Sequence, residues 1–289
     1  MQISQILSSA LSFLLVTVML GIGLMTDFAD FKQVLKNPKA IFVGLFCQAL
    51  LLPAMAFAFC TYIPLPPEFK IGFILLAASP GGPSSNIYSL LARGDIALNL
   101  SLTAINSLTN LVTMPFFAAL AISLYEPAGG HVTSMPFDKF KELCLLVIVP
   151  AAVGLFIRNQ KPKFAQKSAA FIKILSVVLL SFTVTALVYL NWLILLENSK
   201  SFGVIILIFN LLSLGIAYGA AKLARLSRPQ AISIGFEAGI HNGSLALYIA
   251  VNVLRNQAYA IPATIYSVLM YFTAGAVLLF LRRQNSLKH

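Results

Sequence analysis

Charge is the scarcest property of this sequence. Only 10% of the 289 residues are charged, whereas an ordinary soluble domain carries about 25%. In their place 59% of the residues are hydrophobic, and the mean hydropathy of the whole chain is +0.89. A single anchor or signal segment cannot give so high an average, so most of the chain is expected to lie in lipid. The composition excludes a soluble globular protein and predicts a polytopic membrane protein.

Cysteine and histidine are also few. The three cysteines, Cys47, Cys60 and Cys144, lie inside apolar runs, with no CxxC spacing and no histidine cluster beside them. This pattern favours neither a disulfide framework nor a transition-metal site. The net charge of +11 does not indicate a nucleic-acid partner, because the basic residues stand singly or in small groups between apolar runs. They are typical of topology markers in the loops of a membrane protein.

Apolar runs long enough to cross a bilayer recur along the whole chain. They do not alternate between polar and apolar residues, so the fold class is expected to be all-α rather than a barrel. No linker divides the chain, which favours one transmembrane domain over residues 1–289. The sequence predicts nine transmembrane helices, at about residues 3–25, 38–62, 67–92, 95–122, 136–157, 171–193, 201–221, 229–254 and 257–281.

The basic residues support this odd number of helices. With nine crossings, 15 of the 20 basic residues fall on one side of the membrane, and the others are Lys70, Lys139, Lys141, Lys200 and Arg255. Cytoplasmic loops are the ones enriched in lysine and arginine, so the C-terminus is predicted inside and the N-terminus outside, in the cell (inner) membrane. The first apolar run follows no basic segment and is too long for a signal peptide, so we expect it to stay in the protein.

Two of the predicted helices are interrupted near their middle. The third contains Pro80-Gly81-Gly82-Pro83-Ser84-Ser85-Asn86, and the eighth contains Glu237-Ala238-Gly239-Ile240-His241-Asn242-Gly243-Ser244. Each is the third in a run of four helices, which predicts inverted repeats over about residues 3–122 and 171–281, separated by helix five at about 136–157. Paired interrupted helices indicate a secondary transporter and its binding site. A proline kink repaired by Ser84 and Ser85 is the alternative for the first cluster.

One acidic residue stands apart from the others. Eight of the nine lie in loops or at helix ends, whereas Glu237 lies in mid-membrane. A charge there costs about 2.5–3.5 kcal/mol on the insertion scale, so such a residue is a functional candidate, and we expect it to bind a cation. The alternative is a protonated carboxyl that bonds a neighbouring helix or His241, four residues further on. The mid-span hydroxyls and amides suit a hard, weakly bound ion such as sodium.

The combination of these motifs resembles the bile acid:sodium symporter family. The resemblance rests on Pro80-Gly81-Gly82 with Ser85-Asn86, on Leu91-Ala92-Arg93-Gly94-Asp95, and on Glu237-Ala238-Gly239 with Asn242, and it spans almost the whole chain. It implies a core domain that holds two crossing discontinuous helices, and a panel domain that moves against the core.

By position, the resemblance also implies two sodium sites and a substrate cavity. The first sodium site would use Ser85, Asn86, Thr103 and Glu237, with Asn99 where a serine is common. The second would use Gln48, Glu237, the carbonyls of Ala238 and Ile240, and the position of His241, which replaces the usual glutamine and so removes an amide oxygen. The substrate, an organic anion such as a carboxylate or sulfonate, would contact Pro83, Asn242, Gly243 and Ser267.

Together these features predict a sodium-coupled symporter of an organic anion that works by alternating access. Sodium would be the coupling ion, with no cofactor, and the lipid bilayer would surround the protein, with neither nucleic acid nor an obligate protein partner. Three alternatives stay open. They are a proton-coupled carrier of the same fold in which His241 titrates, a channel, and an intramembrane enzyme that uses Glu237 and His241.

Overall fold

The computed structural model describes residues 2–26, 37–126, 137–190 and 192–286, and in these ranges the chain is almost entirely helical. The β-structure recorded there is one isolated antiparallel bridge, between Gly81 and His241. The all-α fold class is confirmed. The helices are α1 (Gln2–Met25), α3 (Pro38–Phe46), η1 (Cys47–Leu51), α4 (Leu52–Tyr62), α5 (Pro67–Ala78), α6 (Pro83–Leu91), α7 (Ile96–Tyr125), α8 (Phe137–Gln160), α9 (Pro162–Leu190), α10 (Trp192–Leu223), α11 (Arg228–Gly239), α12 (Gly243–Tyr248), η2 (Ile249–Val253), η3 (Ala258–Ala260) and α13 (Ile261–Ser286).

Several of these helices can cross a membrane. Within the described ranges five continuous spans are long and apolar enough, and six if the bent helix α7 counts as one crossing. The count of nine stays a prediction, because it adds three crossings to these six. They are α5 with α6 and α11 with α12, each as a single interrupted span, and α8, whose apolar part covers only Cys144–Gln160. None of these four halves exceeds 12 residues, whereas a crossing needs about 20. The inverted repeats and the division into core and panel also stay predictions.

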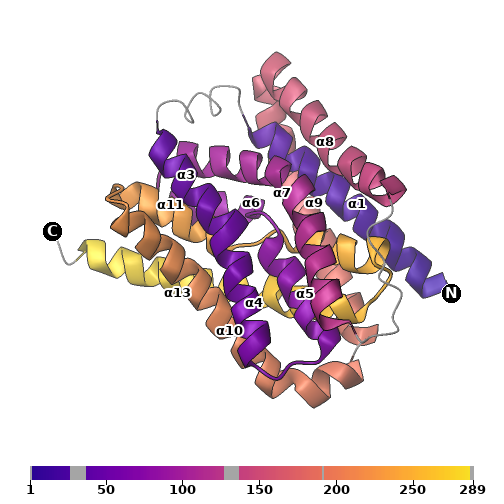
Figure 1. The fold of residues 1–289 in the computed structure, drawn as a ribbon. Helices are drawn as coiled ribbons and strands as arrows, with labels where there is room; N and C mark the ends of the chain where they lie inside the picture. The colour runs from indigo at the N-terminus through magenta and orange to yellow at the C-terminus, as the bar shows by residue number, and fades with distance from the viewer. Residues whose placement is uncertain (1, 27–36, 127–136, 191, 287–289) are drawn as a thin grey trace.

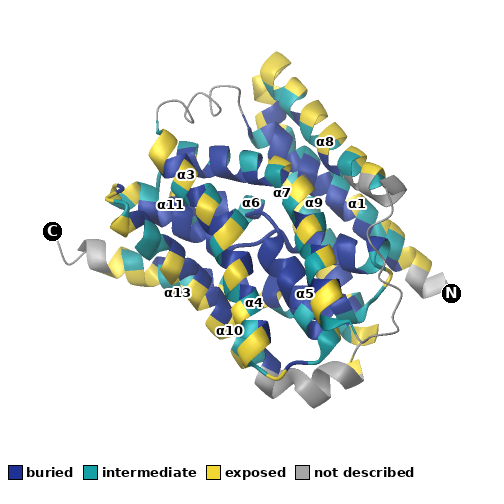
Figure 2. Cartoon of the chain, in the orientation of Figure 1, coloured by how far each residue is buried: buried dark blue, intermediate teal, exposed yellow. Residues whose placement is uncertain are grey.

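Large apolar side chains cover the outside of the molecule. Phe42, Phe116, Phe171 and Phe272 are 68%, 62%, 65% and 72% exposed. Figure 2 shows exposed residues along the outward sides of α4, α8 and α10, with buried residues in the interior. Water would be a poor solvent for so much apolar surface, whereas lipid chains solvate it well. The exterior therefore suits a bilayer.

The helices form two neighbouring groups. In one of them α1 packs against α8 and α9, and Figure 1 shows α1 and α8 side by side at the edge of the molecule. In the other, α10 packs against α11 and α13, and α5 packs against α7. The first group meets the second chiefly where α1 contacts α12. The interrupted helices all belong to the second group.

The two interruptions cross and bind each other. The N–H of Gly82 donates to the carbonyl of Ile240 at 2.6 Å, and the N–H of Asn242 donates to the carbonyl of Pro80 at 2.7 Å. These bonds flank the isolated bridge and satisfy backbone groups that a helix break would otherwise leave bare in hydrocarbon. The backbone at Ser79 and Gly82 is extended, with ψ of 149° and 157°. The helix therefore ends here, and the alternative of a repaired kink does not apply.

Two further distortions follow prolines. Helix α7 bends by 53° between Asn110 and Val112, because the ring of Pro115 clashes with the carbonyl four residues earlier. Pro53 follows η1, a π-helical turn in which the N–H of Leu52 reaches back to the carbonyl of Cys47. Such turns are frequent at functional sites. This one carries Gln48, which is 1% exposed, toward the centre of the molecule.

Candidate ion and substrate site

Glu237 lies near the C-terminal end of α11, beside the crossing. Helix α11 begins with a capping box in which Ser227 and Gln230 exchange hydrogen bonds, and this fixes where the helix starts. Eleven residues lie between the capping residue Ser227 and the last residue of α11, Gly239. The helix therefore carries Glu237 into the interior, where it is 1% exposed. Glycine at position 81 leaves room for it, since a Cβ there would collide with the carboxylate of Glu237.

Three neutral side chains donate hydrogen bonds to the carboxylate of Glu237. Ser85 of α6 donates to Oε2 at 2.8 Å, Thr103 of α7 donates to Oε2 at 2.7 Å, and Asn106 of α7 donates to Oε1 at 3.1 Å. A carboxylate has acceptor sites for all three donors and for further partners. No lysine or arginine of the described residues pairs with it. The group is therefore stabilised by dipoles alone and has capacity left for a cation.

Pairing of Glu237 with His241 does not occur. An interaction between residues four apart needs a continuous helix, and α11 ends at Gly239. His241 lies in the break, where its Nδ1 is 3.2 Å from the carbonyl of Ser79. The alternative in which these two side chains bond each other is therefore wrong.

Asn99 extends the cluster around Glu237. Its amide lies 2.9 Å from Ser85 Oγ and 2.9 Å from Asn86 Oδ1. With the amide nitrogen turned to the carbonyl of Ser233 at 2.7 Å, the amide oxygen accepts from the N–H of Asn86 at 3.1 Å. The structure thus brings together the residues of the first predicted sodium site, which are Ser85, Asn86, Asn99, Thr103 and Glu237.

Asn106 belongs to the same cluster, although it is absent from the predicted site. Asn99, Thr103 and Asn106 follow one another on α7 at spacings of four and three residues, which places them on one face of the helix. That periodicity is visible in the sequence and could have identified Asn106.

The second predicted set meets at the carbonyl of Ser79 rather than at Glu237. Gln48 Nε2 donates to this carbonyl at 2.6 Å, and His241 Nδ1 lies beside it. Gln48 Oε1 and His241 Nε2 are buried without a hydrogen-bond partner among the described residues. The carbonyl of Ile240 already accepts from Gly82, and Ala238 is 2% exposed. The oxygen atoms that could coordinate a cation here are thus an amide oxygen and backbone carbonyls.

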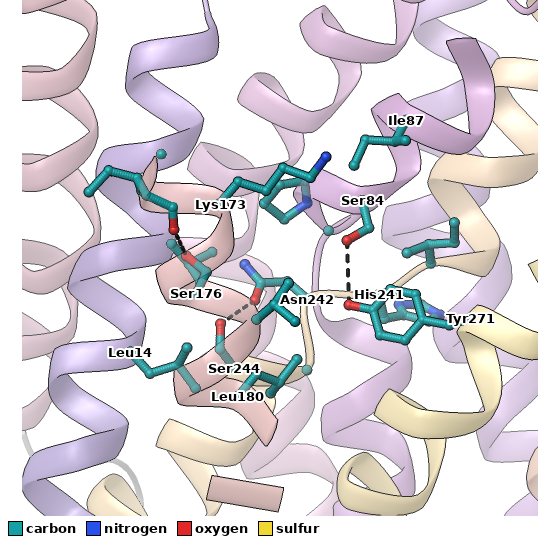
Figure 3. Close-up of a pocket in the computed structure, with 18 of the residues that line it drawn as sticks. Leu14, Ser84, Ile87, Lys173, Ser176, Leu180, His241, Asn242, Ser244 and Tyr271 are labelled. Carbon is teal, nitrogen blue, oxygen red and sulfur yellow. Dashed lines mark hydrogen bonds between the residues drawn. The ribbon is translucent and has the colours of Figure 1, made fainter. Parts of the chain in front are cut away.

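A cavity of about 70 Å³ lies next to the crossing. Helices α1 and α9 form one wall, and α6, α12 and α13 form the other (Figure 3). Its lining includes Pro83, Asn242 and Gly243, which are three of the four residues predicted to contact substrate. The fourth, Ser267, lies behind the wall, because its Oγ occupies the space that a Cβ at Gly243 would need. Tyr271 also lines the cavity, and its hydroxyl oxygen lies 3.4 Å from Ser84 Oγ.

Residues 12–198 match the model of the Sodium Bile acid symporter family. The chain belongs to this family. As a member of the symporter family, it is a multi-pass, sodium-coupled membrane transporter, and the family is one of transporters rather than enzymes.

Relatives of this symporter cover most of the chain. The sodium-dependent transporter YocS of Bacillus subtilis (strain 168) is 27% identical over 262 residues, which are 91% of this chain and 79% of that protein. The ileal sodium/bile acid cotransporter of Homo sapiens is 26% identical over 246 residues, 84% of this chain and 69% of that protein. The P3 protein of Bos taurus is 30% identical over 228 residues, 78% of this chain, and the chain spans about half of it, 47%.

Proposed function

We propose that this symporter couples sodium movement to the transport of an organic anion by alternating access. The observation that carries the proposal is the buried Glu237, which accepts hydrogen bonds from Ser85, Thr103 and Asn106 beside the crossing. A carboxylate with hydroxyl and amide oxygens suits a hard cation. In transporters with paired interrupted helices, the unwound backbone and the half-helix ends hold the coupling ion.

The anion would bind in the cavity beside the crossing. Helix α6 begins there at Pro83, and the start of a helix carries a partial positive charge. Asn242 lines the cavity and is 3% exposed, and its Nδ2 donor has no hydrogen-bond partner among the described residues. The name of the human ileal relative, a bile acid cotransporter, supports an organic anion as the substrate class.

Contacts that we call the latch support alternating access. Asn252 Nδ2 donates to the carbonyl of Ser8 and to Ser12 Oγ, both at 3.0 Å, and the Tyr248 hydroxyl donates to Glu142 Oε1 at 3.1 Å. The latch joins η2 and α12 to α1 and α8, so it ties one group of helices to the other. Its few hydrogen bonds can break and re-form at modest cost, because each contributes about 1 kcal/mol.

The cavity lies on one side of the latch. Along α1 the latch is at Ser8 and Ser12, whereas the cavity is lined from Leu14 to Met25. Met25 is the cytoplasmic end of α1 in the predicted topology. The structure therefore fits a state closed toward the outside, in which the cavity belongs to the inner half of the path.

The proposed cycle takes place in the cell (inner) membrane, with the N-terminus outside and the C-terminus in the cytoplasm. Sodium ions act as coupling ions, and no organic cofactor takes part. The partners are the anion and the surrounding lipid, with no role for nucleic acid or an obligate protein partner.

The test compares Glu237→Gln with the unmodified protein in proteoliposomes. The substitution keeps the shape and one oxygen but removes the charge, so sodium-driven uptake of radiolabelled pantoate, pyruvate or taurocholate is expected to fall to the level of empty liposomes. Stabilisation of the purified protein by sodium, measured as a shift in Tm, should be lost with it. Glu68→Gln, which removes an exposed acid at the start of α5, is the matched control and should change neither.

The same measurement separates the remaining alternatives. Unchanged sodium dependence in Glu237→Gln would return this residue to a structural role. The unpartnered Nε2 of His241 favours a proton-coupled carrier as the second candidate, and uptake driven by a proton gradient without sodium would support it. A flux that does not saturate would indicate a channel, and chemical conversion of a probe would indicate an enzyme.

A further inference from the structure

We propose that Lys173 of α9 is the residue that selects anions in the cavity, by binding the negative group of the substrate. This inference rests on the proposed function, to which it adds a specificity-determining residue. Among the described residues that line the cavity, Lys173 carries the only fixed charge, and the lining contains no aspartate or glutamate. Within this described lining no carboxylate balances the charge of Lys173, so a bound anion or water is left to solvate it.

The position of Lys173 along α9 differs from that of the other lysines at this end of the helix. Lys163 and Lys167 lie in its first two turns, where basic residues mark the cytoplasmic side. Lys173 comes three turns in, about 16 Å from the start of the helix. It therefore lies near the start of the apolar run predicted at about residues 171–193. Lys173 counts among the cytoplasmic basic residues, but of these three lysines it is the one that lines the cavity.

The side chain of Lys173 points across the cavity. Figure 3 shows it extending from α9 toward Ser84 and Ile87 of α6, and so from one group of helices to the other. The side chain is exposed, in keeping with its place beside an open space. An ammonium group there adds a full charge to the partial positive charge at the start of α6.

Asn242 supplies a second donor from the opposite wall. Its Oδ1 accepts from Ser244 Oγ at 2.6 Å, which leaves the amide nitrogen as the group without a partner. A carboxylate or sulfonate has enough acceptor sites to bond this amide and an ammonium group together. An anion held by both would connect α9 to the crossing. A neutral solute would gain the amide bond but not the charge.

The experiment uses the full-length protein in proteoliposomes, with pantoate and pyruvate as probes and their uncharged amides as competitors. In the unmodified protein each acid is expected to inhibit uptake of its labelled form at a concentration about tenfold to a hundredfold below that of its amide, as one charge-assisted hydrogen bond provides. In Lys173→Gln the KM of the acid should rise by about the same factor, while the inhibition constant of the amide stays unchanged. Lys173→Arg should retain the preference for the acid.

Two controls keep the outcomes distinct. Lys167→Gln removes a lysine of the same helix that does not line the cavity, and it should leave KM and the preference for the acid unchanged. Stabilisation by sodium without any anion, measured as Tm, reports on the ion site alone and should be the same in Lys173→Gln and in the unmodified protein.

The possible results lead to different conclusions. If sodium stabilises neither protein, the proposed function fails and the inference fails with it. If sodium stabilises both, but Lys173→Gln keeps the KM and the preference for the acid, the role of Lys173 is overturned and the proposed function stands. Intact sodium binding without uptake of either acid also overturns the inference, because the cavity would then not serve small organic acids.

Discussion

Hydroxyl groups can donate to a carboxylate and still offer a lone pair to a cation. Ser85 and Thr103 both donate to Glu237 Oε2, at 2.8 and 2.7 Å, so their oxygens already lie against the negative charge. A sodium ion that enters between them would meet one carboxylate and two hydroxyl oxygens with little rearrangement. The site owes this arrangement to the crossing, which sets α6 against α7 and α11.

Removing one of these oxygens should weaken sodium binding without abolishing it. Thr103→Ala is expected to raise the sodium concentration for half-maximal uptake about fivefold to tenfold, because it removes a hydroxyl ligand. Asn106→Ala should raise it by about threefold, since Asn106 positions Oε1 through its nitrogen. Thr109→Ala is the control on the same helix, where the hydroxyl donates to the carbonyl of Ile105 at 2.9 Å. Equal effects of all three substitutions would point to a general loss of stability.

His241 determines how many sodium ions we expect to bind. An imidazole nitrogen is a poor sodium ligand, and the oxygen of Gln48 beside it has no partner among the described residues. We predict a sodium Hill coefficient near one for the unmodified protein, with little transport current. His241→Gln restores an amide oxygen and should move the coefficient toward two. Two sodium ions with one monovalent anion carry a net positive charge, which the membrane potential drives by about 2.3 kcal/mol per 100 mV.

Current recordings on proteoliposomes fused to a planar membrane check this prediction, and His241→Leu serves as the control that adds no oxygen. If the unmodified protein already shows steep sodium dependence and an inward current at neutral pH, backbone carbonyls complete the second site and the prediction is wrong.

At the scale of single residues, the sequence predicts the chemistry of the site better than it predicts which residues belong to the site. Glu237 is identifiable because a carboxylate in mid-membrane is costly and therefore marks a functional position. Lys173 is not identifiable from the sequence, because its position along α9 does not say which wall of a cavity its side chain faces. That depends on how α9 rotates against α1, which the tertiary packing decides. The tertiary packing also decides the place of Ser267, which lies one layer behind Gly243 rather than in the lining of the cavity.

Among the helices, the two interruptions were predictable and the other distortions were not. Four residues that disfavour a helix stand together at 80–83, so the ends of α5 and α6 follow from local chemistry. A single proline has several outcomes, including a kink and a π-helical turn, and the neighbouring helices select among them. The turn η1 before Pro53 and the bend of α7 before Pro115 are two such outcomes.

The latch gives a prediction for the movement of one group of helices against the other. Ser12 and Asn252 touch across the boundary at 3.0 Å. In a protein whose native cysteines are replaced, Ser12→Cys with Asn252→Cys should cross-link with a short thiol reagent and hold the outer side closed. Sodium-driven uptake should then stop, and a reducing agent should restore it, because the proposed cycle requires this boundary to open.

The single substitutions are the matched controls for the cross-link. Ser12→Cys alone and Asn252→Cys alone, treated with the same reagent, should keep most of their uptake. Full turnover in the cross-linked protein would contradict a movement at this boundary, and the latch would then be a static contact.

At the scale of the whole molecule, the prediction concerns the orientation of the chain in the membrane. We expect an N-terminal tag to be reachable from outside intact cells and a C-terminal tag only after permeabilisation, because 15 of the 20 basic residues then lie inside. Lys32, Lys36 and Lys288 belong to that majority but lie outside the described residues, so the prediction depends on the sequence alone. Both tags on one side would contradict the count of nine.

The bonds between the interruptions also determine when the chain can finish folding in the cell. Gly82 and Pro80 find their backbone partners at Ile240 and Asn242, which are synthesised on the order of ten seconds later. Until then the break between α5 and α6 has two bare polar groups, each costing several kcal/mol in hydrocarbon. The early segments must therefore wait in the insertion machinery or outside the lipid. A chain that stops after α10 should be degraded by membrane proteases rather than persist as half a transporter.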